Sequence, residues 1–252
     1  MERILNKKTA FITGGGQGIG RGIALKLAEA GANIVIAQRN QETAKSVVDE
    51  IQLMGREATA IYIDVSDSCS VTSCIKVALK TNYQIDILVN NAGIHSETMG
   101  RMSEISDFEE CFNINLFGVW RVTKELLSHF ITRKTGNIIN IASIDGRRPW
   151  IHAPAYSASK AALINLTQSM AETYGKYNIN VNALCPGGII TKIASSYASE
   201  LDYLEKTIMH ERAIKRTITP EDIGNTAVFL ASYKSKSITG QSLNIDCGAL
   251  MN

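Results

Sequence analysis

The chain reads Thr9-Ala10-Phe11-Ile12-Thr13-Gly14-Gly15-Gly16-Gln17-Gly18-Ile19-Gly20 in its first regular unit. Residues 9–13 have the apolar pattern of a buried strand, and helical spacing follows over residues 18–30. Glycines between a strand and a helix allow a tight turn, and they let backbone N–H groups approach an anion at the helix N-terminus. A glycine-rich loop is also compatible with a plain turn, but its position here favours a phosphate-binding loop.

The same alternation of short apolar runs and longer helical patterns continues along the chain. Further strands are predicted at 33–37, 58–63, 85–89, 137–142, 179–184 and 242–245. Further helices are predicted at 41–54, 68–82, 104–134, 154–176 and 220–232. Strands that alternate with helices imply crossover connections, and hence an α/β fold: a doubly wound, seven-stranded parallel sheet with helices on both faces. No linker or repeat interrupts residues 1–252, so the sequence predicts a single domain.

Composition limits the classes of function. The 252 residues carry a net charge of +2, with 45% hydrophobic and 20% charged residues. This balance gives no electrostatic basis for nucleic acid or an anionic membrane as a partner. The five cysteines form no CxxC pair, so no metal site is predicted. Neither a signal-peptide pattern nor an apolar run long enough to span a bilayer is found, and we therefore expect a cytoplasmic protein.

The spacing of the glycines differs from the common GxGxxG loop. With glycines at 14, 18 and 20, residues 13–20 resemble the TGxxxGxG signature of the short-chain dehydrogenase/reductase family. The resemblance covers essentially the whole chain. It implies a Rossmann fold and an NAD(P)-dependent oxidoreductase that interconverts a carbonyl and a secondary alcohol. The other motifs that carry it are Asn90-Asn91-Ala92-Gly93, Tyr156-Ser157-Ala158-Ser159-Lys160, Pro186-Gly187 and Ile238-Thr239-Gly240-Gln241.

The predicted reacting centre combines a phenol, a hydroxyl and a cation. Tyr156 and Lys160 stand at i and i+4 on one face of a helix, and Ser143 follows the fifth strand. A tyrosine with a pKa of about 10 is a poor base at neutral pH, whereas a lysine cation about 5 Å away favours the phenolate. The resemblance implies that Tyr156 is the acid and base, that Ser143 binds the carbonyl oxygen, and that Lys160 also holds the nicotinamide ribose. It further implies that Asn115 anchors a water that links Lys160 to solvent.

The end of the second strand bears on the choice of cofactor. NAD enzymes usually place an acid there to bind the ribose hydroxyls. This chain has Gln38 followed by Arg39, which can offer a planar fork of donors to a 2′-phosphate. The pattern favours NADP(H), with NAD(H) as the alternative, and a solvated surface role for Arg39 stays open.

The resemblance also assigns a set of cofactor contacts. Asp64 is one of them, although an acid at a strand end can equally cap the next helix. The full set is Gly14, Gly16, Gln17, Gly18, Ile19, Gly20, Gln38, Arg39, Asp64, Val65, Asn91, Ala92, Gly93, Tyr156, Lys160, Pro186, Gly187, Ile189 and Thr191.

Two segments are expected to face the substrate. Residues 188–216 are the least regular stretch and are predicted to form a lid. Arg147 and Arg148, between Ser143 and Tyr156, either clamp an anionic group or are solvated or interface residues. The expected substrate is a small-molecule carbonyl or alcohol: a small polar or anionic hydroxy or keto compound, or a polyol. Lid residues that either wall the pocket or only pack within the lid are Tyr197, Tyr203, Met209 and His210.

Two other functions stay open. A 3-oxoacyl-[acyl-carrier-protein] reductase resembles this chain in every motif and docks an acidic carrier on a basic patch. A non-catalytic nucleotide sensor commonly loses the tyrosine or the lysine, whereas this chain keeps both. Candidate patch residues are Lys124, Arg133, Lys134 and Lys176, interrupted by Glu125 and Glu172.

One motif departs from the family. Relatives often read Asp-Gly-Gly near the C-terminus, whereas this chain has Asp246-Cys247-Gly248. Cysteine does not readily take the backbone angles open to glycine, so a different turn is expected there. The resemblance also implies a homodimer or homotetramer built on helices near 104–134 and 154–176, and Cys247 bears on the tetramer because this turn borders subunit contacts in many relatives.

Overall fold

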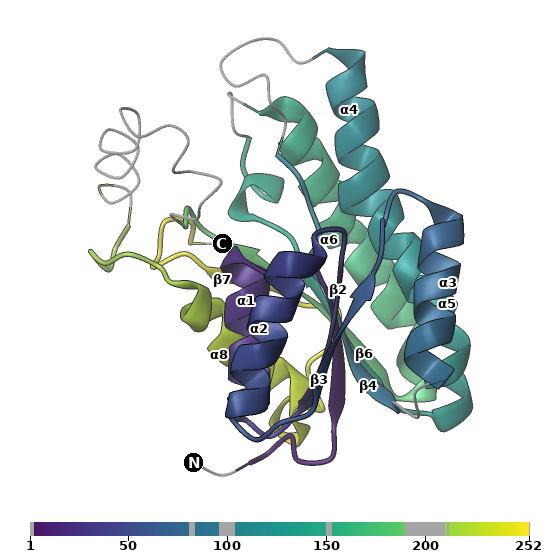
Figure 1. Cartoon of the computed structure of the whole chain (residues 1–252). Helices are drawn as coiled ribbons and strands as arrows, with labels where there is room; N and C mark the ends of the chain where they lie inside the picture. Colours follow the sequence, from purple (N-terminus) through teal and green to yellow (C-terminus); the bar gives the residue numbers. More distant parts are fainter. Residues whose placement is uncertain are drawn as a thin grey trace.

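Seven parallel strands form one sheet in the order β3-β2-β1-β4-β5-β6-β7 (Figure 1). The structure is a computed structural model that describes residues 3–80, 84–95, 104–149, 153–189, 210 and 212–251. All seven predicted strands are confirmed, with ends that differ by at most two residues. Their bounds are β1 Thr9–Thr13, β2 Asn33–Gln38, β3 Ala58–Tyr62, β4 Ile85–Asn90, β5 Gly136–Ile141, β6 Ile179–Pro186 and β7 Ser242–Ile245.

Helices cover both faces of this sheet (Figure 1). One layer holds α1 Gly18–Glu29, α2 Gln41–Leu53 and α8 Pro220–Ala231. The other holds α3 Ser68–Lys80, α4 Ile105–Phe112, α5 Val119–Arg133 and α6 Pro154–Tyr174. The expected doubly wound α/β architecture is therefore confirmed. The helix predicted over 104–134 is divided by a π-helical turn, η1 Asn113–Gly118, which the periodicity of the sequence did not indicate.

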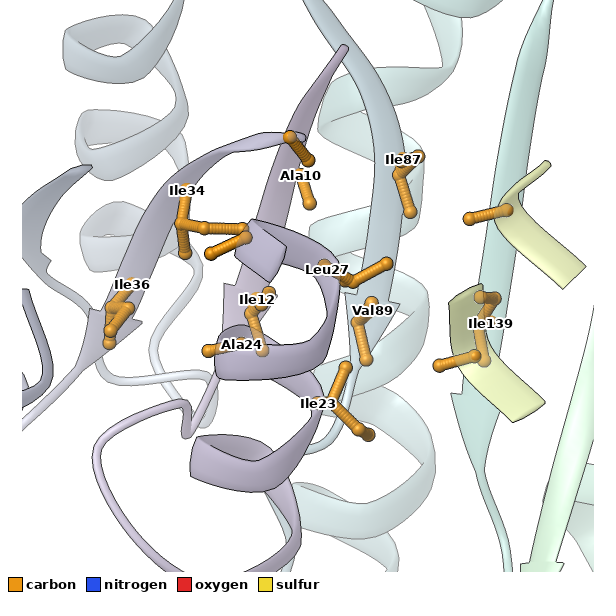
Figure 2. Close-up of a cluster of buried hydrophobic side chains, with 14 of the residues drawn as sticks. Ala10, Ile12, Ile23, Ala24, Leu27, Ile34, Ile36, Ile87, Val89 and Ile139 are labelled. Atoms are coloured by element: carbon orange, nitrogen blue, oxygen red, sulfur yellow. The ribbon is translucent and has the colours of Figure 1, made fainter. Parts of the chain in front are cut away.

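The strands are buried on both faces because neighbouring residues point to opposite sides of a sheet. Ile12 and Val89 pack against Ile23 and Leu27 of α1 in one core cluster (Figure 2). Phe11 and the residues in register with it face the helices of the other layer. All five residues of β1 are buried, which explains why its centre, Ala10-Phe11-Ile12, is apolar without alternation.

The strand order reverses between β1 and β4, and this point places the site. Each strand runs parallel to its neighbour, so the loops after β1, β4, β5 and β6 leave the same edge of the sheet. Thr13 pairs with Asn90 at that edge, which brings the glycine loop beside the Asn91-Ala92-Gly93 motif. In open α/β sheets, ligands bind outside the carboxyl ends of the strands at such a reversal.

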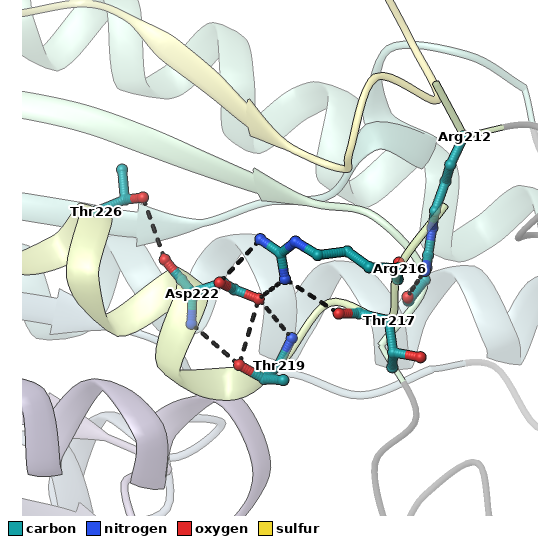
Figure 3. A network of polar contacts seen from close by, with 7 residues as sticks. Arg212, Arg216, Thr217, Thr219, Asp222 and Thr226 are labelled. Carbon is teal, nitrogen blue, oxygen red and sulfur yellow. Dashed lines mark hydrogen bonds and ion pairs between the residues drawn. The ribbon is translucent and has the colours of Figure 1, made fainter. Parts of the chain in front are cut away.

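A polar network fixes the chain where it enters α8 (Figure 3). Thr219 and Asp222 form a capping box, and the Arg216 guanidinium donates to both carboxylate oxygens of Asp222 at 2.7 and 3.0 Å. Buried Arg212 donates to the carbonyl oxygens of Arg216, at 2.7 Å, and of Gly188. The bonds of Arg212 therefore hold the exit of β6 beside the entry of α8.

The premise that cysteine does not take a glycine-like backbone angle at position 247 is wrong, while the expected difference from the turn of relatives stays a prediction. Cys247 adopts a left-handed backbone with φ of 57°, and Gly248 follows with φ of 76°. The Asp246 carboxylate accepts hydrogen bonds from the N–H groups of Gly248, at 2.9 Å, and Leu250, at 2.8 Å. These bonds, and one from Ile214 N–H to the Cys247 carbonyl at 2.9 Å, keep the turn despite the side chain.

Cys247→Gly is expected to raise the free energy of unfolding by about 0.5–1 kcal/mol. Relief of a left-handed non-glycine residue gains about 1–2 kcal/mol, and the added chain entropy of glycine in the unfolded state cancels part of it. Denaturant unfolding measures the difference. Cys69→Gly in α3 is the matched control and is expected to lower stability, because glycine weakens a helix. A loss of stability in both variants would contradict the strain at Cys247.

Among the helices of the described ranges, none combines the length and the hydropathy that a membrane crossing requires.

Candidate active site

The loop after β1 is shaped for an anion by its glycines. Gly14 has φ of 67°, a left-handed angle that L side chains rarely adopt. A Cβ at Gly20 would collide with the Gly14 carbonyl oxygen and lie 2.5 Å from the Asn91 amide nitrogen. The turn therefore closes on itself so tightly that only glycine fits at its end.

The loop is tied to the end of β4. Asn91 donates its side-chain amide to the carbonyl oxygens of Thr13, at 3.1 Å, and Gly14, at 2.8 Å. The Thr13 hydroxyl accepts in return from the N–H groups of Asn91 and Ala92, each at 3.0 Å. The Asn91 side chain thus positions the glycine loop rather than projecting freely into the site.

The N-terminus of α1 fits a dinucleotide phosphate. Gln17 is its N-cap residue but makes no side-chain capping bond, and the first turn of α1 contains no acidic residue. Backbone N–H groups at a helix start carry partial positive charge and favour an anion. With the glycine turn before it, this donor set matches a pyrophosphate. Ile19 points the other way and packs against the core.

Gln38 and Arg39 occupy the end of β2 in different ways. The Gln38 side chain folds back: its oxygen accepts from Gly16 N–H at 2.8 Å, and its nitrogen donates to Thr43 Oγ1 at 2.6 Å. The Arg39 side chain is 66% exposed and lies 4.0 Å from the Asp64 carboxylate. The guanidinium is thus held only loosely.

Asp64 and Val65 follow β3. The Asp64 carboxylate accepts from Ser66 N–H at 2.9 Å and Ser66 Oγ at 2.6 Å. These hydrogen bonds, with smaller effects from Arg39 and Arg121, hold the pKa of Asp64 below its usual value. The carboxylate is engaged in a turn with Ser66 rather than in a helix cap. Buried Val65 packs closely on Gly118.

Ser143, Tyr156 and Lys160 come together at the carboxyl edge of the sheet. Lys160 Nζ lies 5.6 Å from the centre of the Tyr156 ring and donates to the Ile141 carbonyl at 2.8 Å. Ser143 is close enough to Tyr156 to lower the pKa of its hydroxyl. Gly93 is close as well, since a Cβ there would lie 3.4 Å from Lys160 Nζ. A phenol, a hydroxyl and an ammonium therefore share one site with two of the predicted cofactor-binding loops.

Burial changes the titration of the pair. Desolvation raises the pKa of Tyr156 well above its usual value, and the nearby Asp145 charge raises it further, while the Ser143 hydrogen bond opposes both. Desolvation lowers the pKa of Lys160 to about 8. The expectation that the Lys160 cation, together with the bound nicotinamide, favours the phenolate of Tyr156 stays a prediction.

Asn115 lies in η1 and is fully buried. Its amide oxygen accepts from Ile94 N–H at 2.8 Å, and its amide nitrogen donates to the Ile94 carbonyl and to Ser159 Oγ, each at 3.0 Å. Both amide hydrogens are therefore used to clamp the loop after β4 to α6. A water held between Asn115 and Lys160 stays a prediction.

Two side chains at the site were not singled out from the sequence. The His95 ring stacks on the Tyr156 ring with centres 4.4 Å apart and planes inclined by 29°. The Asp145 carboxylate accepts a hydrogen bond from the Ser143 hydroxyl at 3.1 Å. Both residues follow a strand at its carboxyl end, and that position in a parallel sheet was the signal that could have found them.

The remaining predicted residues are placed only in part. Gly187 N–H donates to the Ile245 carbonyl at 3.0 Å, next to Pro186 at the end of β6. Ile189 packs against the core. Thr191 lies outside the described residues, as do Tyr197, Tyr203, Met209 and most of the predicted lid, while His210 is exposed.

Arg147 has partners away from the reacting groups. Its guanidinium donates to the Ser242 carbonyl at the start of β7, and it also hydrogen-bonds Cys185 of β6. A substrate anion held by Arg147 would have to draw the guanidinium away from both. Arg148 is half-buried. The anion clamp therefore stays a prediction.

The sequence matches a known family and named relatives. Residues 8–202 match the family model described as short chain dehydrogenase. Oxidoreductase UcpA of Escherichia coli K12 is 39% identical, over 98% of this chain and 96% of that protein. The 3-oxoacyl-[acyl-carrier-protein] reductase FabG of Staphylococcus aureus N315 is 34% identical, over 97% of this chain and 98% of that protein.

Solved structures agree with the fold. A putative NAD(P) dependent gluconate 5-dehydrogenase from Beutenbergia cavernae with bound NADP superposes with a TM-score of 0.91 at 32% identity, over 99% of both chains. A 7α-hydroxysteroid dehydrogenase complexed with NADH and 7-oxo glycochenodeoxycholic acid gives a TM-score of 0.93 at 32% identity, over 100% of this chain and 97% of that one. The neighbours thus include proteins with either nicotinamide cofactor.

Proposed function

Because the chain belongs to the short-chain dehydrogenase family and is an oxidoreductase, we propose that it transfers hydride between NADP(H) and a carbonyl/secondary alcohol pair. The observation that carries the proposal is the convergence of Tyr156, Ser143 and Lys160 beside the loops after β1 and β4. The proposed small molecule is a polar or anionic hydroxy or keto compound, or a polyol.

Each side chain has a proposed task. When bound, the nicotinamide supplies the hydride in reduction and accepts it in oxidation. Tyr156 donates its phenolic proton to the product oxygen in reduction and takes it back in oxidation. Ser143 donates a hydrogen bond to the carbonyl oxygen and so stabilises its developing negative charge. The Lys160 cation stabilises the phenolate left on Tyr156. Asn115 holds Ile94 by two hydrogen bonds, and so keeps the neighbouring His95 ring against the Tyr156 ring.

NADP(H) is supported by the groups at the end of β2. Gln38 brings no negative charge, and the exposed Arg39 guanidinium has the reach and the donor fork for a 2′-phosphate. The alternative cofactor, NAD(H), would be favoured by a carboxylate at the end of β2, and neither Gln38 nor Arg39 supplies one.

Oligomer formation through the α4–α5 region is also proposed, because large apolar side chains are exposed there: Ile105, Phe117 and Trp120.

A polar substrate is supported by the groups around Tyr156. Asp145 and His95 place a carboxylate and an imidazole beside the reacting hydroxyls. Two structural neighbours are described as putative gluconate dehydrogenases, a name that points to a polyhydroxy acid as substrate. The second candidate is reduction of a 3-oxoacyl thioester, favoured by the 34% identity to FabG.

A dehydrogenase screen tests the proposal. Purified protein is assayed with NADP and NAD side by side against polyols, sugars, hydroxy acids, steroids and, in the reducing direction, an acetoacetyl thioester. We expect turnover with a polyol or hydroxy acid and a higher kcat/KM with NADP. Turnover confined to the thioester would favour the second candidate, and no turnover with any member together with no cofactor binding would reject both.

A further inference from the structure

Arg121 joins two segments that lie far apart in the sequence. It stands in the first turn of α5, and its half-buried guanidinium donates to three acceptors. One is the Val65 carbonyl, at 3.2 Å, and the others are the Asn113 carbonyl, at 3.0 Å, and Asn113 Oδ1, at 2.8 Å. These acceptors belong to the loop after β3 and to η1, so one side chain spans both segments.

The loop after β3 borders the proposed site for the adenosine half of the cofactor. Arg39, the proposed partner of the 2′-phosphate, lies 4.0 Å from the Asp64 carboxylate of this loop. Val65 follows Asp64 and also packs on η1, because a Cβ at Gly118 would lie 3.0 Å from Val65 Cγ2. A hydrogen bond from Arg121 and a close apolar contact therefore hold the same residue of the loop.

The turn η1 leads from Arg121 to the helix that carries the reacting phenol. Asn113 opens η1, and Asn115 follows in the same turn. Asn115 Nδ2 donates to Ser159 Oγ at 3.0 Å, and Ser159 Oγ donates to the Tyr156 carbonyl at 2.7 Å. Because the side chains of Asn115 and Ser159 are fully buried, water does not compete for these bonds. Hydrogen bonds therefore connect both ends of η1 to the two halves of the site.

The chemistry of arginine suits this place. A guanidinium offers five N–H donors in a rigid, planar fork, so it can hold acceptors from two segments at once. A carbonyl oxygen has two lone pairs, so the Asn113 carbonyl can accept from Arg121 in addition to a helical N–H group. Hydrogen bonds from a charged donor are also about twice as strong as neutral ones. The loop after β3 is thus fixed to η1 by more than packing.

We propose that Arg121 is a positioning residue that holds the loop after β3 against η1, and so sets the spacing between the adenosine end and the reacting end of the cofactor site. This inference rests on the proposed function. A dinucleotide touches both ends, so its affinity and the alignment of its nicotinamide both depend on that spacing. Loss of the guanidinium therefore weakens the binding of the adenosine half and slows hydride transfer together.

Arg121→Met tests the role of the fork, because methionine keeps a long aliphatic chain but has no N–H donor. Calorimetry measures the Kd of adenosine 2′,5′-bisphosphate, the adenosine half of NADP, and reports on the loop without any reaction. Single-turnover oxidation of saturating NADPH, followed by its absorbance, reports on hydride transfer without product release. We expect the Kd to rise about 10-fold and the single-turnover rate to fall about 10-fold. A change in only one of the two values, or in neither, would overturn the proposal.

Three further variants separate positioning from folding. Asn113→Ala removes one of the three acceptors and should move both values in the same direction by about threefold, so it carries the test if Arg121→Met does not fold. Arg121→Lys keeps a cation that can donate to the two carbonyl oxygens, and should recover part of both losses. Lys76→Met removes an exposed positive charge from the neighbouring helix α3 and is expected to change neither value.

The double variant Arg121→Met/Asn113→Ala should be no more impaired than Arg121→Met, because the Asn113 side chain acts through the guanidinium. Fully additive losses would show that the two residues act separately and would contradict the proposal. Unchanged fragment binding and an unchanged rate for Arg121→Met, in an enzyme that turns over, would reject the role of Arg121 alone. No cofactor binding and no turnover in the parent protein would reject the proposed function, and this inference with it.

Discussion

Tyr156→Phe is expected to lower kcat for carbonyl reduction by about 10²–10⁴-fold, the range that general acid catalysis contributes. The substitution removes one hydroxyl and leaves the ring that stacks on His95 and lies beside Lys160. Because the proton donor is needed only as negative charge develops on the substrate oxygen, KM should change much less than kcat. Steady-state kinetics with the substrate found in the screen measures both constants.

The control separates chemistry from folding. Tyr174→Phe removes the same hydroxyl from the last residue of the same helix, far along α6 from the site, and should leave kcat within about twofold. Cofactor binding measured by fluorescence should be retained in both variants. A Tyr156→Phe enzyme that keeps full activity would remove the phenol from the mechanism.

Arg39→Ala is expected to lower kcat/KM for NADP by about 10- to 100-fold while kcat/KM for NAD stays nearly constant. Hydrogen bonds from a charged donor to a charged acceptor contribute about 1.5–3 kcal/mol each, and alanine removes the guanidinium fork entirely. Only NADP carries the 2′-phosphate, so the ratio of the two kcat/KM values isolates this interaction.

A second variant approaches the same position from the opposite side. Gln38→Asp introduces a carboxylate at the end of β2, which should repel a 2′-phosphate and accept hydrogen bonds from ribose hydroxyls. It also removes the hydrogen bond that the Gln38 side chain accepts from Gly16 N–H. The rise in kcat/KM for NAD should therefore be smaller than the fall in kcat/KM for NADP. Lys45→Ala, an exposed lysine on α2, is the control for the general loss of positive charge. If Arg39→Ala lowers kcat/KM equally for NADP and NAD, the role of Arg39 is its contact with Asp64 and not the binding of a 2′-phosphate.

Particular elements show how far the sequence predicts this protein. Residues 10–12 are apolar and the flanking Thr9 and Thr13 are buried as well, and a strand buried on both faces in a parallel sheet favours such a pattern. The bounds of β1 and β7 are those predicted, and α8 begins at Pro220 as predicted, because Pro220 and the capping box at Thr219 fix the start of that helix. Strand patterns and helix caps depend on residues only a few positions apart, so the sequence alone predicts where these elements begin and end.

Other features depend on residues far apart in the sequence. The π-helical turn η1 contains Asn115, whose side chain is bonded to Ile94 and Ser159. Periodicity in residues 104–134 does not carry that information. Cys247 takes a left-handed angle because the Asp246 carboxylate and the Ile214 N–H hold its turn, and these bonds outweigh the preference of a single residue.

By itself, the sequence determined the doubly wound fold and the family, because strand burial, helix periodicity and glycine spacing are local patterns along the chain. Only the tertiary structure decided which charges meet at the site. It brought His95 and Asp145 to Tyr156, turned Arg147 toward β7, and placed Tyr156 and Lys160 where desolvation raises the pKa of the phenol and lowers that of the ammonium. The physical reason is that burial and the distance between charges set the energy of an ionised group, and both are properties of packing rather than of residue type.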